Sequence, residues 1–166
     1  MTLWLIGMMG SGKSSAGRMA ADHLDVPFYD TDVEIEASAD MAIGDIFSTR
    51  GESAFREMES STIDRLAGRV AVVATGGGAV LDRDNVEKMR NTGPVLLLQA
   101  SHSTLIDRLG DPAGRPLLDP GSPERDLIAI DEERRHLYVT AATEVIDTDH
   151  LDVSEVARRI EQLWNS

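Results

Sequence analysis

The segment from Gly7 to Ser14 constrains the fold of this chain more than any other part of the sequence. It reads Gly-Met-Met-Gly-Ser-Gly-Lys-Ser, a complete G-x-x-x-x-G-K-S pattern between a short apolar run, Leu3–Ile6, and a stretch of helical periodicity. Glycines let the backbone N–H groups turn toward phosphate oxygens, and the start of a helix adds partial positive charge. In such a loop the lysine, here Lys13, reaches the β- and γ-phosphates, and the Ser14 hydroxyl binds Mg²⁺. We therefore predict a strand, a phosphate-binding loop and a helix; the alternative is a glycine-rich turn with a chance lysine.

Further short apolar runs follow along the chain and are predicted to be strands. They are Pro27–Tyr29, Val70–Ala74, Val95–Leu98 and Glu144–Ile146. Helical periodicity lies between them, first over Ala16–Leu24 and last over Val153–Trp164. Strands that alternate with helices in this way are typical of a parallel sheet covered on both faces. We therefore predict an α/β fold with three layers, in which helices flank a five-stranded parallel sheet.

Composition excludes several classes of function. The 166 residues are enough for one domain, and the absence of cysteine rules out disulfides and thiolate metal sites. With 29 acidic and 16 basic residues the net charge is -13, which disfavours nucleic-acid binding because affinity for a polyanion depends on Lys and Arg. No apolar run approaches the roughly 20 residues that cross a bilayer, and no basic segment precedes the first apolar run. We expect a cytoplasmic protein that binds neither membranes nor nucleic acid.

Two carboxylates follow the second predicted strand, in the segment Asp30-Thr31-Asp32. Ligands of open α/β folds bind at the carboxyl edge of the sheet. Because alternate residues of an extended segment point to opposite sides, one carboxylate could face a metal and phosphates while the other faces an acceptor hydroxyl. The alternative is that one of them caps a helix that begins near Val33. Asp32 could serve in both roles.

An irregular segment, Asp111–Pro123, interrupts the alternation of strands and helices. It contains four of the six prolines of the chain and two glycines, so neither a helix nor an interior strand can persist there. A connection of this length inside a domain is usually a lid, a binding loop or a flexible surface link. Arg115, Leu117 and Leu118 favour a lid, because a solvated linker has little use for paired leucines.

Taken together, the motifs resemble those of the shikimate kinase family. Beyond the phosphate loop, the resemblance rests on Asp30-Thr31-Asp32, Phe55-Arg56 with Glu59, Gly76-Gly77-Gly78-Ala79-Val80, Arg115-Pro116-Leu117-Leu118, and Arg134 with Leu137-Tyr138. It implies a nucleoside monophosphate kinase-like architecture and a monomer that transfers the ATP γ-phosphoryl group to the 3-hydroxyl of shikimate, for aromatic amino-acid biosynthesis. It also implies one kinase domain over residues 1–166, with a substrate-binding region at about 31–62 and a lid at about 110–124.

The resemblance further implies a role for each matching residue. Asp32 accepts a hydrogen bond from the attacking hydroxyl and acts as its base, while Lys13 and Arg115 stabilise the transferring phosphate. The residues implied to bind ATP are Gly10, Ser11, Gly12, Lys13, Ser14, Ser15, Arg108 and Arg115. Those implied to bind shikimate are Asp32, Arg56, Gly76, Gly77, Gly78 and Arg134. Mg²⁺, the implied metal, is held by Ser14 and, through a water molecule, by Asp30.

Two other functions remain open. A kinase of the same fold could phosphorylate a different acceptor, as gluconate kinase does. A regulatory module could bind phosphate without turnover, although such a module has no need of the full set of Asp32, Arg56, Arg115 and Arg134. One segment departs from the family pattern, because Asp147–Asp152 is acidic where family members often carry basic residues beside the adenine.

Overall fold

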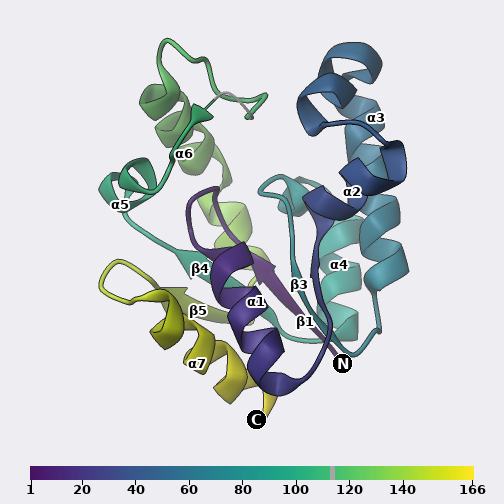
Figure 1. Ribbon diagram of the computed structural model, residues 1–166, viewed down its shortest axis with the longest axis vertical. Helices are drawn as coiled ribbons and strands as arrows, with labels where there is room; N and C mark the ends of the chain where they lie inside the picture. The colour runs from purple at the N-terminus through teal and green to yellow at the C-terminus, as the bar shows by residue number, and fades with distance from the viewer. Residues whose placement is uncertain (113–114) are drawn as a thin grey trace.

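A five-stranded parallel sheet with helices on both faces organises the computed structural model, which describes residues 1–112 and 115–166 (Figure 1). The strands are β1 (Thr2–Ile6), β2 (Phe28–Asp30), β3 (Ala71–Ala74), β4 (Val95–Gln99) and β5 (Glu144–Asp147). They lie in the order β2-β3-β1-β4-β5, and all pairs are parallel. The predicted fold class and the five predicted strands are confirmed.

Helices make up the outer layers. They are α1 (Lys13–Leu24), α2 (Thr31–Ala39), α3 (Ile43–Leu66), α4 (Arg83–Thr92), α5 (His102–Asp107), α6 (Pro123–Ala141) and α7 (Val153–Trp164), with a 3₁₀ turn, η1, at Ala79–Leu81. The helices predicted at both ends of the chain are confirmed as α1 and α7. Among the described residues no helix is long and apolar enough to cross a membrane.

Strand β1 is buried along its whole length because both of its faces are covered. Leu3 and Leu5 pack with residues of α1 and α7 on one face. Trp4 and Ile6 alternate with them and pack with residues of α3, α4 and α6 on the other face. Because both faces are buried, the residues Leu3–Ile6 form a continuous apolar run in the sequence.

The connections place a crevice at the carboxyl end of β1. The chain leaves β1 toward β2, whereas the connection from β3 crosses to β4 on the other side of β1. Loops that diverge in this way open the ligand site of doubly wound sheets. In Figure 1, α2 and the first half of α3 rise on one side of this point, and the segment that leads into α6 rises on the other.

The region from α2 to the middle of α3 has a small core of its own, made by Ile35, Ile46 and Phe55. A kink at Gly51, whose φ is +84°, separates the two halves of α3. The second half then runs along the sheet, where Ile63 and Leu66 join the main core. This bend brings the Phe55–Glu59 turn over the carboxyl edge of the sheet.

The predicted lid at about 110–124 includes residues 113 and 114, which lie outside the described residues. Arg115 and the residues that follow it lead into α6. Leu118 is buried in the main core, and its backbone N–H donates to the carbonyl of Arg115. The segment is therefore anchored to the body of the protein at Leu118, whereas the residues on either side of Leu118 are partly or fully exposed; such an anchor is not expected of a solvated linker.

Candidate active site

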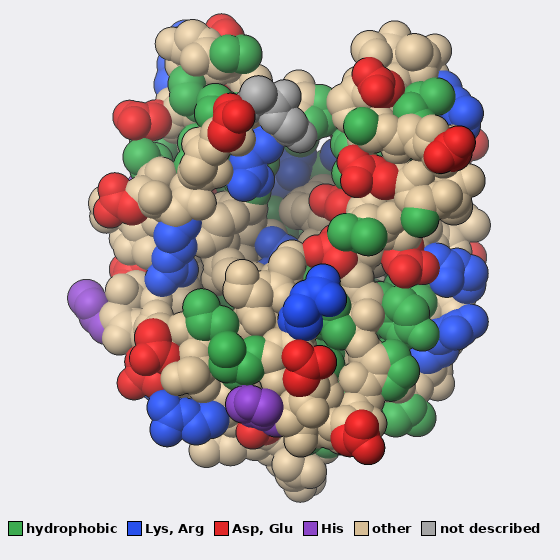
Figure 2. Space-filling view, in the orientation of Figure 1, with side chains coloured by type: hydrophobic (Ala, Val, Ile, Leu, Met, Phe, Trp, Pro, Cys, Tyr) green, Lys and Arg blue, Asp and Glu red, His purple; other side chains and the backbone are tan. Residues whose placement is uncertain are grey.

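A cavity of about 700 Å³ opens at the carboxyl edge of the sheet, between α3 and the segment before α6. Figure 2 shows it as a hollow with basic side chains inside. It is lined by every residue predicted to bind ATP, shikimate or Mg²⁺. Its basic lining residues are Lys13, Arg56, Arg108, Arg115 and Arg134. A strongly acidic chain thus gathers cationic side chains at one place, and the local field, not the net charge, governs which ligands a cleft attracts.

The phosphate loop joins β1 to the start of α1, as the sequence pattern predicts. Its glycines Gly7, Gly10 and Gly12 all have positive φ, a backbone conformation that disfavours other residues. The Lys13 ammonium is buried and donates to the carbonyl oxygens of Gly7 and Met8, at 2.8 Å each. Burial lowers the pKa of Lys13 to about 8, although nearby carboxylates oppose the shift. The loop therefore holds a buried amino group beside the open cavity.

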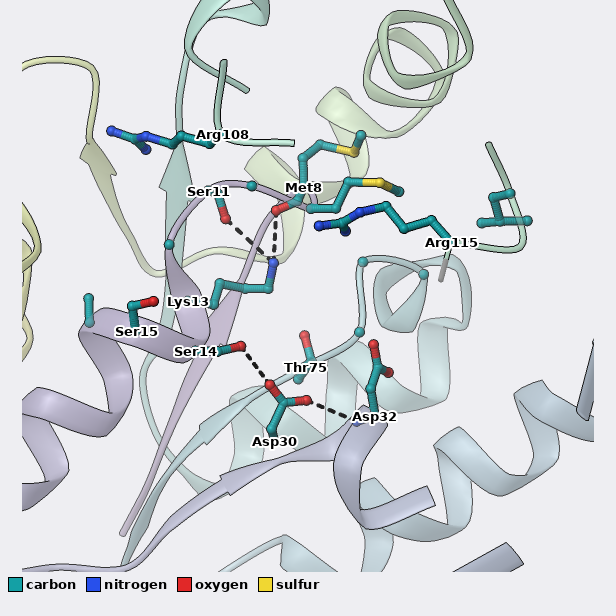
Figure 3. A pocket seen from close by; sticks show the side chains of 18 of the residues that line it. Met8, Ser11, Lys13, Ser14, Ser15, Asp30, Asp32, Thr75, Arg108 and Arg115 are labelled. Carbon is teal, nitrogen blue, oxygen red and sulfur yellow. Dashed lines mark hydrogen bonds between the residues drawn. The ribbon is translucent and has the colours of Figure 1, made fainter. Parts of the chain in front are cut away.

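Asp30 connects the phosphate loop to α2 (Figure 3). Its Oδ2 accepts a hydrogen bond from the Ser14 hydroxyl at 2.6 Å, and its Oδ1 accepts one from the backbone N–H of Asp32 at 3.1 Å. Asp30 is thus the N-cap of a helix that begins at Thr31. The prediction of a helix start near Val33 was wrong by two residues, because the chain turns directly after β2.

Asp32 consequently lies in the first turn of α2 and not on an extended segment, so strand alternation does not explain how the two carboxylates separate. Burial raises the pKa of Asp32 to about 6; the Asp30 charge adds to the shift and Lys13 opposes it. Its Oδ1 is buried and has no hydrogen-bond partner among the described residues. A carboxylate with a pKa nearer neutrality is a better general base than an ordinary aspartate.

In the loop Gly76–Gly78 after β3, charged side chains occupy the space that a Cβ would need at Gly76 and at Gly78. A Cβ at Gly76 would lie 2.6 Å from Asp32 Oδ1 and 2.9 Å from Glu59 Oε1, and a Cβ at Gly78 would lie 2.1 Å from Arg56 Nη1. The consecutive glycines, a weak signal in the sequence, therefore allow three charged side chains to pack directly against the backbone.

Two guanidinium groups border this glycine loop. Arg56, on α3, pairs with Glu59 at 2.9 Å and with Glu52 at 3.1 Å. Arg134, on α6, is 7% exposed, and its Nε has no hydrogen-bond partner among the described residues. Guanidinium groups bind carboxylates through two parallel hydrogen bonds. The arrangement suits an anionic acceptor that places its carboxylate at this end of the cavity.

Glu59 is a member of the site to which the sequence analysis gave no role. It is 1% exposed, and its Oε1 lacks a hydrogen-bond partner among the described residues. Burial raises the pKa of Glu59 to about 7 in spite of the Arg56 charge beside it. Its position three residues after Arg56 on the same helix, the spacing of a helical ion pair, is the signal that could have found it.

Replacement of Glu59 with glutamine should flatten the dependence of stability on pH. The folded pKa lies near 7, above the ordinary 4.5, so the unfolded chain loses its proton first as pH rises. The wild-type protein therefore loses stability between about pH 4.5 and pH 7, by as much as about 3 kcal/mol, and the variant does not lose this contribution. Thermal unfolding at pH 5, 6, 7 and 8 measures the difference, with Glu57→Gln on the exposed side of α3 as the control. Parallel pH profiles for wild type and Glu59→Gln would contradict the assignment.

The other end of the cavity lies near α7. Arg108 donates to the hydroxyl and the carbonyl of Thr148, at 3.0 and 2.9 Å, which fixes its guanidinium plane. The carboxylates of the acidic loop Asp147–Asp152 form hydrogen bonds with nearby backbone. Asp149 accepts from the backbone N–H of Ser101, and Asp152 caps α7. These hydrogen bonds give the departure from the family pattern a structural reason.

Arg115 extends from the segment before α6 toward the phosphate loop (Figure 3). Its Nη2 donates to the carbonyl of Leu109 at 3.2 Å. Its charge is close enough to Lys13 to contribute to the lowered pKa of that residue. The segment thus carries a second cation to the place where phosphates are expected.

Comparison with known proteins identifies close relatives. The model of a family described as shikimate kinase matches residues 9–164. The shikimate kinase of Symbiobacterium thermophilum is 42% identical over 163 residues, which are 96% of this chain and 94% of that protein. The structure of shikimate kinase from Acinetobacter baumannii in complex with shikimate is 34% identical, with a TM-score of 0.93 over 99% of this chain and 92% of that chain. A gluconokinase from Sinorhizobium meliloti is 22% identical, with a TM-score of 0.61 over 97% of this chain and 89% of that chain, which is a likeness of fold alone.

Proposed function

Because this chain belongs to the shikimate kinase family, we propose that the cavity described above is where it carries out the family's reaction. The reaction transfers the γ-phosphoryl group of ATP to the 3-hydroxyl of shikimate and yields ADP and shikimate 3-phosphate. The observation that carries this placement is the packing of Asp32, Arg56 and Arg134 around one glycine loop. That loop borders the same cavity as the phosphate loop.

The acceptor end of the cavity suits shikimate, a hydroxylated carboxylic acid. Arg56 and Arg134 hold its carboxylate from two sides of the Gly76–Gly78 loop. Asp32 then orients the attacking hydroxyl and accepts its proton during transfer. The raised pKa of Asp32 supports this role because it brings the carboxyl closer to the pH at which the reaction runs.

The phosphate end stabilises charge. Backbone N–H groups of the loop at the start of α1 bind phosphate oxygens, and Lys13 and Arg115 add two positive charges near the transferring group. Arg108, fixed on Thr148, presents its guanidinium face to the base of the nucleotide. Phosphoryl transfer depends mainly on such positioning and charge neutralisation.

Ser14 at the start of α1 and Asp30 at the end of β2 also fit the magnesium ion that the family typically uses. Ser14 Oγ and Asp30 Oδ2 lie 2.6 Å apart and offer the hard oxygen ligands that Mg²⁺ prefers. Among the described residues no group of three or more acidic or histidine side chains is arranged to hold a metal ion, but Mg²⁺ at phosphoryl-transfer sites needs only one or two protein oxygens besides the phosphates. Ser14 would bind the ion directly and Asp30 through water. When bound, Mg²⁺ supplies neutralisation of charge on the phosphates.

We propose that the segment at about 110–124 closes over the bound substrates and excludes water, since a kinase open to water would hydrolyse ATP. Arg115→Ala should therefore lower kcat about 100-fold and leave the Kd of shikimate within about twofold, because Arg115 acts on the transferring phosphate. Steady-state kinetics and calorimetric titration measure the two quantities. The control is Arg125→Ala, an exposed arginine outside the cavity. An Arg115→Ala protein with wild-type kcat would argue against the role.

The function itself is tested by incubating the purified protein with Mg²⁺, ATP and a panel of acceptors that includes shikimate, quinate and gluconate. Shikimate should be the best acceptor, and ³¹P and ¹H NMR should place the new phosphate on its 3-hydroxyl. A higher rate with gluconate than with shikimate would favour the alternative that this protein is a gluconate kinase. No product with any acceptor, from well-folded protein that binds ATP, would favour a binding module.

A further inference from the structure

We propose that the Tyr138 hydroxyl fixes the position of the acceptor pocket relative to the phosphate loop, which makes Tyr138 a positioning residue for phosphoryl transfer. Tyr138 lies on α6, one turn after Arg134, and is 2% exposed. The proposal rests on the function proposed above, in which the two ligand sites share one cavity.

The hydroxyl lies where three parts of the site meet. The hydroxyl donates to the carbonyl oxygen of Gly77 at 2.6 Å, and Met8 Sδ lies 3.5 Å from Tyr138 Oη. A hydroxyl has one hydrogen, so the carbonyl takes the hydrogen bond and the sulfur packs against the oxygen. A Cβ at Gly77 would lie 3.3 Å from Tyr138 Oη and 3.8 Å from Arg134 Nη1. The phosphate loop, the glycine loop and α6 therefore converge on one oxygen atom.

The two residues that contact the Tyr138 hydroxyl, Met8 and Gly77, are each connected to a group that takes part in the proposed reaction. On the phosphate side, the backbone carbonyl of Met8 accepts a hydrogen bond from the Lys13 ammonium at 2.8 Å. On the acceptor side, Gly76 precedes Gly77 and packs against the Asp32 carboxylate. Contacts thus run without a gap from the phosphate-binding lysine, through Tyr138, to the proposed base.

The contact of Tyr138 with Gly77 and Met8 is buried, and the Tyr138 hydroxyl does not change its protonation state near neutral pH. Met8 is also almost completely buried. Burial raises the pKa of Tyr138 to about 12, so the hydroxyl keeps the hydrogen that it donates to Gly77. A hydrogen bond in a buried, low-dielectric environment is stronger than one in water. It holds the glycine loop to a long helix that is itself part of the core.

The physical consequence concerns kcat more than affinity. Reacting atoms must be held about 3 to 3.5 Å apart and in line, and a displacement of about 1 Å can cost about 100-fold in rate. If the hydroxyl is lost, the carboxylate site and the phosphate loop each keep their own ligands. Their relative placement, however, becomes looser. ATP and shikimate should then bind almost normally but react slowly.

The test is Tyr138→Phe, which removes one oxygen atom and keeps the buried ring. We expect kcat to fall about tenfold, the Kd values of ATP and shikimate to stay within about twofold, and the ratio of ADP to shikimate 3-phosphate to rise. The matched control is Thr2→Val. It removes a buried hydroxyl that donates to the Arg69 carbonyl at 2.7 Å, at the opposite end of β1. The control should lower Tm comparably and leave kcat and the ADP ratio unchanged.

Several results would overturn the proposal: a kcat of Tyr138→Phe within twofold of wild type, a loss of shikimate affinity that accounts for the lower rate, or an equal loss of kcat in Thr2→Val. If Tyr138→Phe does not fold, Met8→Leu changes the contact with the Tyr138 hydroxyl from the side of the phosphate loop. It should lower kcat about threefold with unchanged Kd values, and an unchanged kcat would overturn the proposal. The wild-type protein is assayed in parallel. Absence of product there would contradict the proposed function as well, whereas an active wild type confines any failure to Tyr138.

Discussion

Replacement of Asp32 with asparagine should lower kcat by about 1,000-fold while the Kd of ATP stays within about twofold of the wild-type value. Asparagine has nearly the same size and can still accept a hydrogen bond from the hydroxyl, but it cannot accept the proton. Asp32→Ala, which also removes the hydrogen bond, should be at least as slow. Steady-state kinetics with shikimate and calorimetric titration with ATP measure the two quantities.

The control for this pair is Asp45→Asn, which alters an exposed carboxylate at the start of α3 outside the cavity. It should keep wild-type kcat. A near-normal kcat for Asp32→Asn would show that orientation of the hydroxyl suffices and that Asp32 is not the base. A loss of ATP binding in the same variant would instead place Asp32 in the nucleotide site.

Lys13→Met should also lower kcat by about 100- to 1,000-fold, for a different reason. The buried ammonium lies beside the phosphate site, and methionine replaces it with a side chain of similar length and no charge. The apparent affinity for ATP should fall as well, because Lys13 contacts the phosphates in both the ground state and the transition state. Affinity for shikimate alone, measured by calorimetry, should remain within about twofold.

The chain supplies a matched control, because its other lysine is Lys88. Lys88 pairs with Asp64 near the surface and lies outside the cavity. Lys88→Met should keep wild-type kcat and ATP affinity. Wild-type kinetics in Lys13→Met would contradict the role of the phosphate loop, since no other lysine is available to replace it.

The sequence predicted the fold because its signals are local and agree with one another. In β1, which is buried on both faces, the residues after Thr2 are all apolar, and a phosphate loop needs glycines where φ is positive. Both constraints act on neighbouring residues, so they are visible in the order of amino acids. The same holds for the five strands and for the helices α1 and α7.

The start of α2 was less predictable. Whether Asp30 or Asp32 caps the helix depends on where β2 ends, and that end is set by pairing with β3 at Asp30. Asp30 then satisfies both the backbone of α2 and the hydroxyl of Ser14. The second contact is with a residue in another element, which no local pattern reveals.

Glu59 and Tyr138 show the same limit. Each belongs to a motif that the sequence analysis quoted, yet its importance comes from a partner distant in the chain: Glu59 shares the space beside Gly76 with Asp32, and Tyr138 bonds to Gly77. Spacing along a helix places Glu59 beside Arg56 and Tyr138 near Arg134. It does not show that a glycine loop packs against both.

The most direct test of the account is a crystal structure of the protein with ADP, Mg²⁺ and shikimate. Arg56 and Arg134 should both bind the shikimate carboxylate, and the 3-hydroxyl should lie within hydrogen-bond distance of Asp32 and point toward the β-phosphate end of ADP. Shikimate bound with its carboxylate away from both arginines, or with another hydroxyl at Asp32, would contradict it.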